Sequence, residues 1–203
     1  MITVVDYGMG NLYSVVKALR LYTETEVTVS SDPSSLRKSR AVVMPGDGAF
    51  AMAMSNLEKG GWIEPLKEYI SSDGYFLGIC LGYQLLFDSS EEFGLHSGLG
   101  IVPGRVVRFP DDNLKVPHMG WNRVEFRKNS PFLEGIDPGS YFYFIHSYYP
   151  VIGDESWLVG EAEYGLKFGC VIGKGNLFAS QFHPEKSHSA GLKIIENFVR
   201  ISC

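Results

Sequence analysis

The sequence predicts an α/β fold with a mostly parallel central sheet flanked by helices, to which an antiparallel or mixed portion is added. Before residue 93, short apolar runs alternate with segments of helical periodicity and with glycine-containing turns, the pattern of a doubly wound sheet. From Phe93 to Phe182, short β-like runs and turns take over, which indicates strands added to the same sheet. With 203 residues, 45% of them hydrophobic, the chain can bury one core, so we expect a single domain.

The first half of the chain supplies the parallel part. Ile2 to Asp6 is an apolar, β-branched run, and it is followed by a glycine loop and a helical pattern. Gly8 and Gly10 lack the third glycine of a dinucleotide fingerprint, so that site is rejected. The next elements, in order, are strands at Glu26 to Ser30 and Arg40 to Met44, helices at Ala49 to Leu57 and Trp62 to Ser71, and a strand, turn and helix between Gly74 and Leu86.

The second half supplies the β-rich portion and a final helix. The β-like runs are Ile101 to Phe109, Arg123 to Phe126, Tyr141 to Ile145, Trp157 to Glu161, Phe168 to Ile172 and Leu177 to Phe182. Lys174-Gly175-Asn176 is typical of a hairpin turn between the last two. Ala190 to Ile201 returns to helical spacing.

Composition excludes several classes of function. The net charge of −5, without a run of Lys or Arg, argues against nucleic-acid binding. No apolar run is long enough to span a bilayer and the start lacks a signal peptide, so we expect no membrane association and a cytoplasmic location. Cys80, Cys170 and Cys203 include no CxxC pair, and no His and acid residues have metal-ligand spacing, so we expect neither a disulfide framework nor a metal or cofactor.

Cys80 lies at the corner of a predicted nucleophile elbow. In Gly78-Ile79-Cys80-Leu81-Gly82, a cysteine stands between two glycines with the spacing of the G-x-S-x-G motif. Residues without a Cβ atom let the strand and the helix approach closely around a strained nucleophile. The motif alone leaves a second interpretation open, because a lone cysteine is often a small buried core residue.

A base and its orienting carboxylate follow the last strand. His183 and Glu185 are two residues apart, so in an extended segment both side chains project from one face. Histidine can take and return a proton at neutral pH, and a carboxylate fixes its tautomer. Together with Cys80 they predict acyl transfer through a thioester. The other histidines, at positions 96, 118, 146 and 188, have no acidic neighbour in this arrangement or lie in surface-like surroundings, and we interpret them as structural.

Two further groups are expected beside the thiol. The tetrahedral intermediates of acyl transfer need oxyanion donors, for which the N–H of Leu81 and the loop Gly46-Asp47-Gly48 are the best candidates. Gln84 lies four residues after Cys80, hence one helical turn away on the same side, where it can bond the group that the thiol attacks.

These motifs resemble those of the class I, or triad, glutamine amidotransferases, which hydrolyse glutamine to glutamate and ammonia. The resemblance rests on Gly78 to Leu86 together with Gln181-Phe182-His183-Pro184-Glu185. Further blocks resemble the glutaminase subunits of imidazole glycerol phosphate synthases, namely Asp6 to Leu12, Pro45 to Phe50, Pro117 to Asn122 and His146 to Tyr149. The resemblance implies one glutamine amidotransferase type 1 domain over residues 1–203, with a flavodoxin-like fold.

The resemblance also assigns roles to residues. It implies that Cys80 is the nucleophile, His183 the base and Glu185 its partner. The residues that it implies for holding glutamine are Gly48, Leu81, Gln84, Ser147 and Tyr148. The implied partner is a cyclase subunit, a (β/α)8 barrel that uses the ammonia to make imidazole glycerol phosphate and an aminoimidazole carboxamide ribotide in histidine biosynthesis. The implied interface residues are Asn11, Trp121, Tyr143 and Lys186.

One position departs from the resemblance. Asp47 stands where the family pattern has Val, in the loop whose peptide is expected to flip to complete the oxyanion hole. Two other functions remain open from the sequence: an amidotransferase subunit of another pathway, which the block Pro117 to Asn122 disfavours, and a non-catalytic relative, which the intact triad disfavours.

Overall fold

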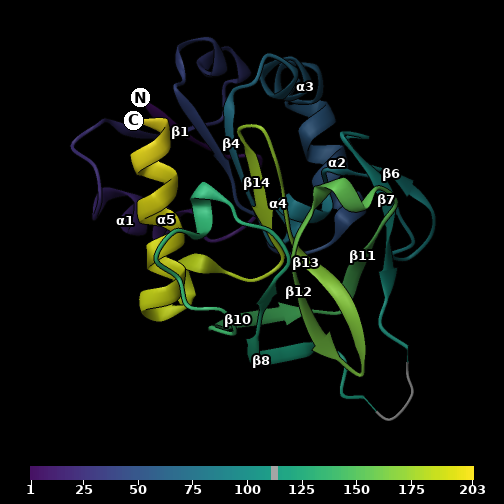
Figure 1. Cartoon of the computed structure of the whole chain (residues 1–203). Coiled ribbons are helices and arrows are strands. Elements are labelled where there is room, and N and C mark those ends of the chain that lie inside the picture. Colours follow the sequence, from purple (N-terminus) through teal and green to yellow (C-terminus); the bar gives the residue numbers. More distant parts are fainter. Residues whose placement is uncertain (111–113) are drawn as a thin grey trace.

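The computed structural model describes residues 1–110 and 114–203 and is built around one eight-stranded sheet. The strand order is β2-β1-β3-β4-β14-β13-β12-β9 (Figure 1). The parallel part consists of β1 (Ile2–Val5), β2 (Val27–Ser30), β3 (Ala41–Met44), β4 (Tyr75–Ile79) and β14 (Leu177–Ser180). An antiparallel extension continues it with β13 (Leu166–Lys174), β12 (Leu158–Tyr164) and β9 (Glu125–Phe126). The predicted mostly parallel sheet is thus confirmed.

Helices cover both faces of the parallel part (Figure 1). On one face, α1 (Leu12–Arg20) and α5 (His188–Ser202) pack in one hydrophobic cluster with Ile2 and Val4. On the other, α2 (Phe50–Lys59) and α3 (Ile63–Ser71) pack in a second cluster with Val5 and Val42. Alternate residues of each strand point to opposite faces, and because both faces are covered, every residue of β1 and β3 is buried.

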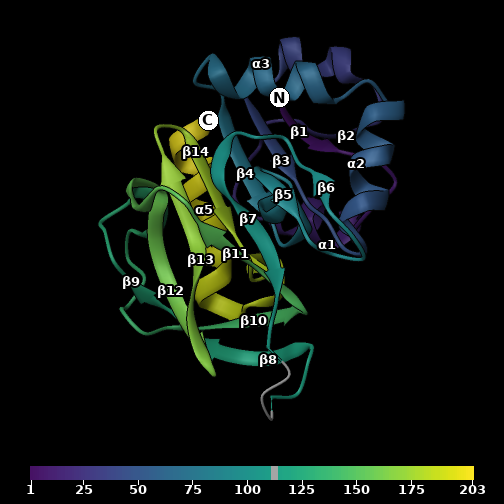
Figure 2. The same cartoon turned by 90° about the vertical axis from the view of Figure 1, so that its right-hand side faces the viewer.

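The predicted β-rich portion is present, but it is divided into three parts. Besides the extension of the main sheet there is a four-stranded sheet, in the order β11-β7-β5-β6, with β5 (Phe87–Ser90), β6 (His96–Ser97), β7 (Val102–Arg108) and β11 (Tyr148–Ile152). The third part is a two-stranded ribbon of β8 (His118–Arg123) and β10 (Tyr141–His146). Figures 1 and 2 place this ribbon at the end of the molecule opposite α3.

Two predicted elements differ from the structure. The helical pattern after Cys80 extends to Leu86 in the sequence, but α4 is only Leu81–Gln84, since the apolar residues that follow turn into β5 of the second sheet. The run Arg123 to Phe126 is not one strand: β8 ends at Arg123 and β9 begins at Glu125. The remaining short elements are the 3-10 helices η1 (Pro33–Lys38), η2 (Pro131–Leu133), η3 (Glu155–Trp157) and η4 (Pro184–Lys186).

Within the described ranges, no helix is long and apolar enough to cross a membrane.

Candidate active site

Cys80 lies between β4 and α4 in a strained backbone conformation. Its φ of 54° and ψ of −107° lie in a region that non-glycine residues rarely adopt, and such strain persists where the surroundings impose it. A Cβ atom on Gly82 would lie 2.0 Å from the carbonyl oxygen of Met44, and one on Gly78 would lie 2.9 Å from that of Gly82. Both glycines are therefore required by close backbone contacts, and the predicted strand, tight turn and helix are present.

His183 and Glu185 form a buried pair next to this turn. Nδ1 of His183 lies 2.8 Å from Oε1 of Glu185, and their side chains are 5% and 2% exposed. Because the carboxylate accepts, Nδ1 carries the proton and Nε2 faces away from Glu185. Among residues 1–110 and 114–203, Nε2 has no hydrogen-bond partner, so it is free to exchange a proton with a reacting group. The pair is not held by an extended segment as predicted, since residues 184–186 form the 3-10 helix η4.

The sheet brings this pair to the cysteine. Ile79 of β4 is in register with Ser180 of β14, and the N–H of Cys80 donates to the carbonyl of Ser180 at 2.8 Å. Burial by itself lowers the pKa of His183, but the charge of the Cys80 sulfur and the bond to Glu185 outweigh it and raise this pKa to about 10. The imidazole is therefore electrostatically coupled to both predicted partners.

The predicted oxyanion loop follows β3 and lies against the start of α4. A Cβ atom on Gly46 would lie 2.7 Å from Cβ of Leu81 and 2.8 Å from the nitrogen of Gly82. Among the described residues, the N–H groups of Leu81 and Gly82 have no backbone acceptor, as expected for the first turn of a helix. Gly48 has a φ of +108°, and Asp47 is exposed.

A carboxylate that belongs to none of the sequence motifs anchors this loop. Oε2 of Glu92 accepts from the N–H of Phe50 at 2.6 Å and so caps the N-terminus of α2, where a negative charge is favoured. Glu92 follows β5 and lies 42 residues from Phe50 in the sequence, so only the tertiary fold reveals the contact.

Gln84 is close to the site, and its amide is already bonded within the protein. Its Nε2 donates to the carbonyl of Tyr148 and to Oε1 of Gln181, both at 2.9 Å. Only Oε1 of Gln84 therefore remains to bond a ligand. Nε2 of Gln181 in turn lies 3.8 Å from the Cys80 sulfur. In the sequence Gln181 is only part of a motif, although its two-residue spacing from His183 already places it on the same side of the chain.

The remaining predicted residues lie around this centre. Ser147 and Tyr148 are half-buried where β10 passes to β11. Of the expected interface residues, Trp121 and Tyr143 face each other on the outer side of the ribbon, with ring centroids 6.1 Å apart, and Lys186 lies on η4, which contacts β10 and α1. Asn11 is exposed and caps α1, accepting from the N–H of Ser14 at 3.2 Å.

Cys170, Cys203, His118 and His146 lie outside this triad. Cys170 is fully buried in β13, where burial raises the pKa of its thiol, and Cys203 is exposed at the end of α5. His118 and His146 are buried and bonded to each other. No group of three or more His, Cys, Asp and Glu with metal-binding geometry occurs in residues 1–110 and 114–203.

Comparison with known proteins identifies the class to which this fold and site belong. Residues 3–201 match the family model "Glutamine amidotransferase class-I". Two solved structures share the fold: a glutamine amidotransferase, with a TM-score of 0.74 and 19% identity over 100% of this chain and 99% of that one, and PurLQS from Thermotoga maritima, with 0.73 and 16% over 98% and 97%. At these identities the structures support the fold alone.

Curated relatives identify the family within that class. The chain is 48% identical to the imidazole glycerol phosphate synthase subunit HisH of Syntrophotalea carbinolica, over 98% of both chains. It is 50% identical to the HisH subunit of Desulfitobacterium hafniense, over 98% of this chain and 93% of that protein. The chain therefore belongs to the HisH family of class I glutamine amidotransferases.

Proposed function

We propose that the chain is the glutaminase subunit of an imidazole glycerol phosphate synthase, hydrolysing glutamine to glutamate and ammonia. The observation that carries the proposal is the strained Cys80 beside a buried His183–Glu185 pair whose Nε2 is unbonded. Its membership of the HisH family supports the same activity.

The first half of the reaction forms a thioester. Nε2 of His183 takes the proton of the Cys80 thiol, the sulfur attacks the carboxamide carbon of glutamine, and the carbonyl oxygen becomes an oxyanion that the N–H of Leu81 and a donor from the loop 46–48 stabilise. His183 gives its Nε2 proton to the nitrogen that leaves as ammonia, while Glu185 holds the ring through Nδ1. The carbon–nitrogen bond breaks and a carbon–sulfur bond remains.

The second half is hydrolysis. His183, now neutral, takes a proton from water, and the resulting hydroxide attacks the thioester carbon. The carbon–sulfur bond breaks, glutamate leaves, and His183 returns its proton to the sulfur, which restores the thiol. In this proposal Gly48, Ser147, Tyr148 and Oε1 of Gln84 hold the substrate.

The ammonia is proposed to pass directly to a cyclase subunit with a (β/α)8 barrel. Ammonia released into water at neutral pH becomes mostly ammonium, which is not a nucleophile, so an enclosed route to the acceptor is chemically useful. In this proposal Asn11, Trp121, Tyr143 and Lys186 contact the partner.

The test is glutamine hydrolysis by Cys80→Ala, measured with and without the cyclase subunit and its nucleotide ligand. We expect the variant to lose activity but to keep the wild-type Tm, because the removed sulfur is a reacting atom in a small side chain. Cys203→Ala, which removes an exposed thiol outside the site, is the matched control and should retain full activity.

The same assay tests whether glutamine hydrolysis depends on the cyclase subunit. We expect the wild-type chain to be slow alone and fast with the cyclase and its ligand. Full activity of the lone chain would contradict the coupled function, and activity of Cys80→Ala would contradict the proposed nucleophile.

A further inference from the structure

A buried network of hydrogen bonds connects the ribbon β8–β10 with the sulfur of Cys80. In order, the buried network consists of Asn122, His118, His146, the carbonyl of Tyr148, Gln84, Gln181 and Cys80. The side chains of its central members are nearly inaccessible, with exposed fractions of 3% for His118, 6% for His146 and 0% for Gln181. Polar groups at this depth are costly unless each is bonded, so the pattern of donors is informative.

The direction of every bond on the ribbon side follows from one acceptor. A carbonyl can only accept, so Nδ1 of His146, 2.8 Å from the oxygen of Tyr148, donates to it. Nε2 of a neutral His146 then accepts from Nδ1 of His118 at 2.9 Å. Nε2 of His118 is left to accept from Nδ2 of Asn122 at 3.2 Å. Burial lowers the pKa of His118 to about 4 and that of His146 to about 3, in agreement with two neutral rings.

The same carbonyl fixes the direction on the cysteine side. Nε2 of Gln84 must face the oxygen of Tyr148, and its second hydrogen bonds Oε1 of Gln181. The amide of Gln181 is thereby oriented with its Nε2 toward the sulfur, at 3.8 Å. An N–H group aimed at sulfur stabilises the thiolate relative to the thiol.

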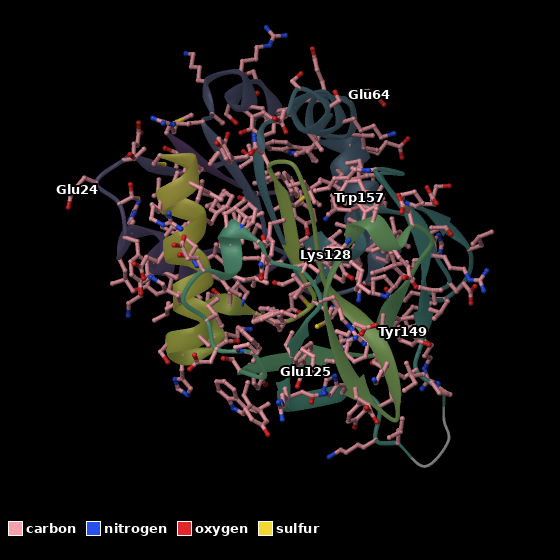
Figure 3. All side chains as sticks on the ribbon, viewed as in Figure 1. Glu24, Glu64, Glu125, Lys128, Tyr149 and Trp157 are labelled. Carbon is pink, nitrogen blue, oxygen red and sulfur yellow. The ribbon has the colours of Figure 1, made fainter. Side chains whose placement is uncertain are left out.

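The ring of His118 is held between aromatic rings, and the ribbon also contacts His183, the proposed base. The ring of His118 is stacked between those of Tyr164 and Phe144, with centroids 4.1 and 4.9 Å away. The same aromatic cluster includes Phe109, whose ring centroid lies 6.2 Å from that of His118 and 4.6 Å from that of Tyr149, labelled in Figure 3. On β10 the carbonyl of Tyr143 accepts from the N–H of His183 at 3.0 Å. The ribbon is thus bonded to the segments that carry both the nucleophile and the base.

We propose that the buried network positions the reacting groups: Gln181 donates an N–H to the Cys80 sulfur, and His118 and His146 hold Tyr148 and Gln84 in the orientation that makes this possible. Gln181 touches the reacting atom and is a catalytic residue. His118 and His146 act through other groups and are positioning residues. The proposal rests on the proposed glutaminase activity.

The first test concerns Gln181. Gln181→Glu keeps an oxygen for Gln84 to bond but replaces the donor at the sulfur with a negatively charged acceptor. In a Cys203→Ala background, we expect alkylation of Cys80 by iodoacetamide at neutral pH to slow at least about tenfold. Alkylation needs no glutamine, so this readout is independent of substrate binding. An unchanged rate would overturn the role of Gln181.

The second test concerns His118, in the complex with the cyclase subunit. His118→Phe keeps an aromatic ring but removes both nitrogens, and we expect kcat/KM for glutamine to fall about tenfold, mostly through KM, because Tyr148 and Gln84 lose their orientation. His118→Asn retains a donor near the position of Nδ1 and should recover most of the loss. The matched control is Tyr164→Phe, which removes a 2.7 Å bond to the carbonyl of Lys115 in the same cluster and should change kcat/KM less than about twofold.

A wild-type KM in His118→Phe, with only its Tm lowered, would overturn the positioning role. If His118→Phe does not fold, His118→Asn tests the positioning role instead. A KM within about twofold of the wild-type value supports that role, and a KM raised tenfold or more contradicts it. These outcomes differ from failure of the glutaminase function itself, which is shown by activity that survives Cys80→Ala.

Discussion

A carboxylate at position 47 stands beside a site that must accumulate negative charge. Burial raises the pKa of Tyr7, and the charges of Cys80 and Asp47 raise it further, so both charges act on the same phenol. That phenol donates to the carbonyl of Pro45, next to the loop. Asp47 follows Gly46, which lies against the first turn of α4, and a negative charge in this position disfavours a thiolate and an oxyanion.

Asp47→Asn should make the enzyme faster. The change keeps the size of the side chain and removes the opposing charge, and we expect kcat/KM for glutamine to rise about threefold at low ionic strength and less at high ionic strength, where an exposed charge is screened. Glu64→Gln is the control, because Glu64 projects from α3 away from the site (Figure 3) and should leave kcat/KM unchanged. A fall in kcat/KM would instead indicate that Asp47 binds substrate.

The three residues of the triad can be predicted from the sequence because their spacing is local. Cys80 between two glycines and His183 two residues from Glu185 are readable without a fold. The contacts of Glu92 and Gln181 cannot be predicted in this way, since their partners, Phe50 and Cys80, are 42 and 101 residues away. Long-range side-chain bonds leave no periodic trace in a sequence.

At the scale of elements, the elbow depends on contact between the backbones of β3 and α4. The first turn of α4 lies so close to the end of β3 that residue 82 has no room for a side chain. This contact sets the position of the Leu81 N–H relative to the Pro45–Gly48 loop, which leaves β3 at the same end.

Gly82→Ala should destabilise the chain by about 3 kcal/mol or more, because the new Cβ would lie 2.0 Å from a carbonyl oxygen and the backbone would have to move. The matched control is Gly61→Ala. Gly61 has a φ of +69°, but a methyl group there would have no atom within 4 Å. This change should therefore cost only about 1 to 2 kcal/mol, the energy of placing a non-glycine residue in the left-handed conformation. Urea unfolding of both variants measures the difference, and equal losses would refute the steric argument.

Elements are predictable from the sequence where the period is clear. β1, β3 and β4 are buried on both faces and are recognisable as β-branched or apolar runs, while α1 and α5 are recognisable by helical spacing. β8 and β11 escape prediction, because His118–Arg123 and Tyr148–Ile152 mix polar, aromatic and glycine or proline residues. Their strand character comes from pairing with β10 and β7 rather than from their own pattern.

At the scale of the whole molecule, the ribbon has two faces with different tasks. His118 and Asn122 face inward and belong to the buried network, whereas Met119 and Trp121 alternate with them and are 59% and 45% exposed. Exposed aromatic and methionine side chains of this kind are typical of protein interfaces. The proposed docking face and the buried network are therefore on opposite sides of the same two strands.

Trp121→Ala should weaken binding of the cyclase subunit while leaving the fold intact. The indole is stacked on the ring of His188, at 4.8 Å and 5° between planes, so it is held in place before a partner arrives and little side-chain entropy is lost on docking. We expect Kd, measured by titration calorimetry, to rise at least about tenfold, in the range of an interface hot spot. Phe93→Ala is the matched control, since Phe93 is 85% exposed in the loop between β5 and β6, away from the ribbon. If both variants bind equally well, Trp121 is not at the interface; if Phe93→Ala alone is weakened, the partner docks on the face formed by the second sheet instead.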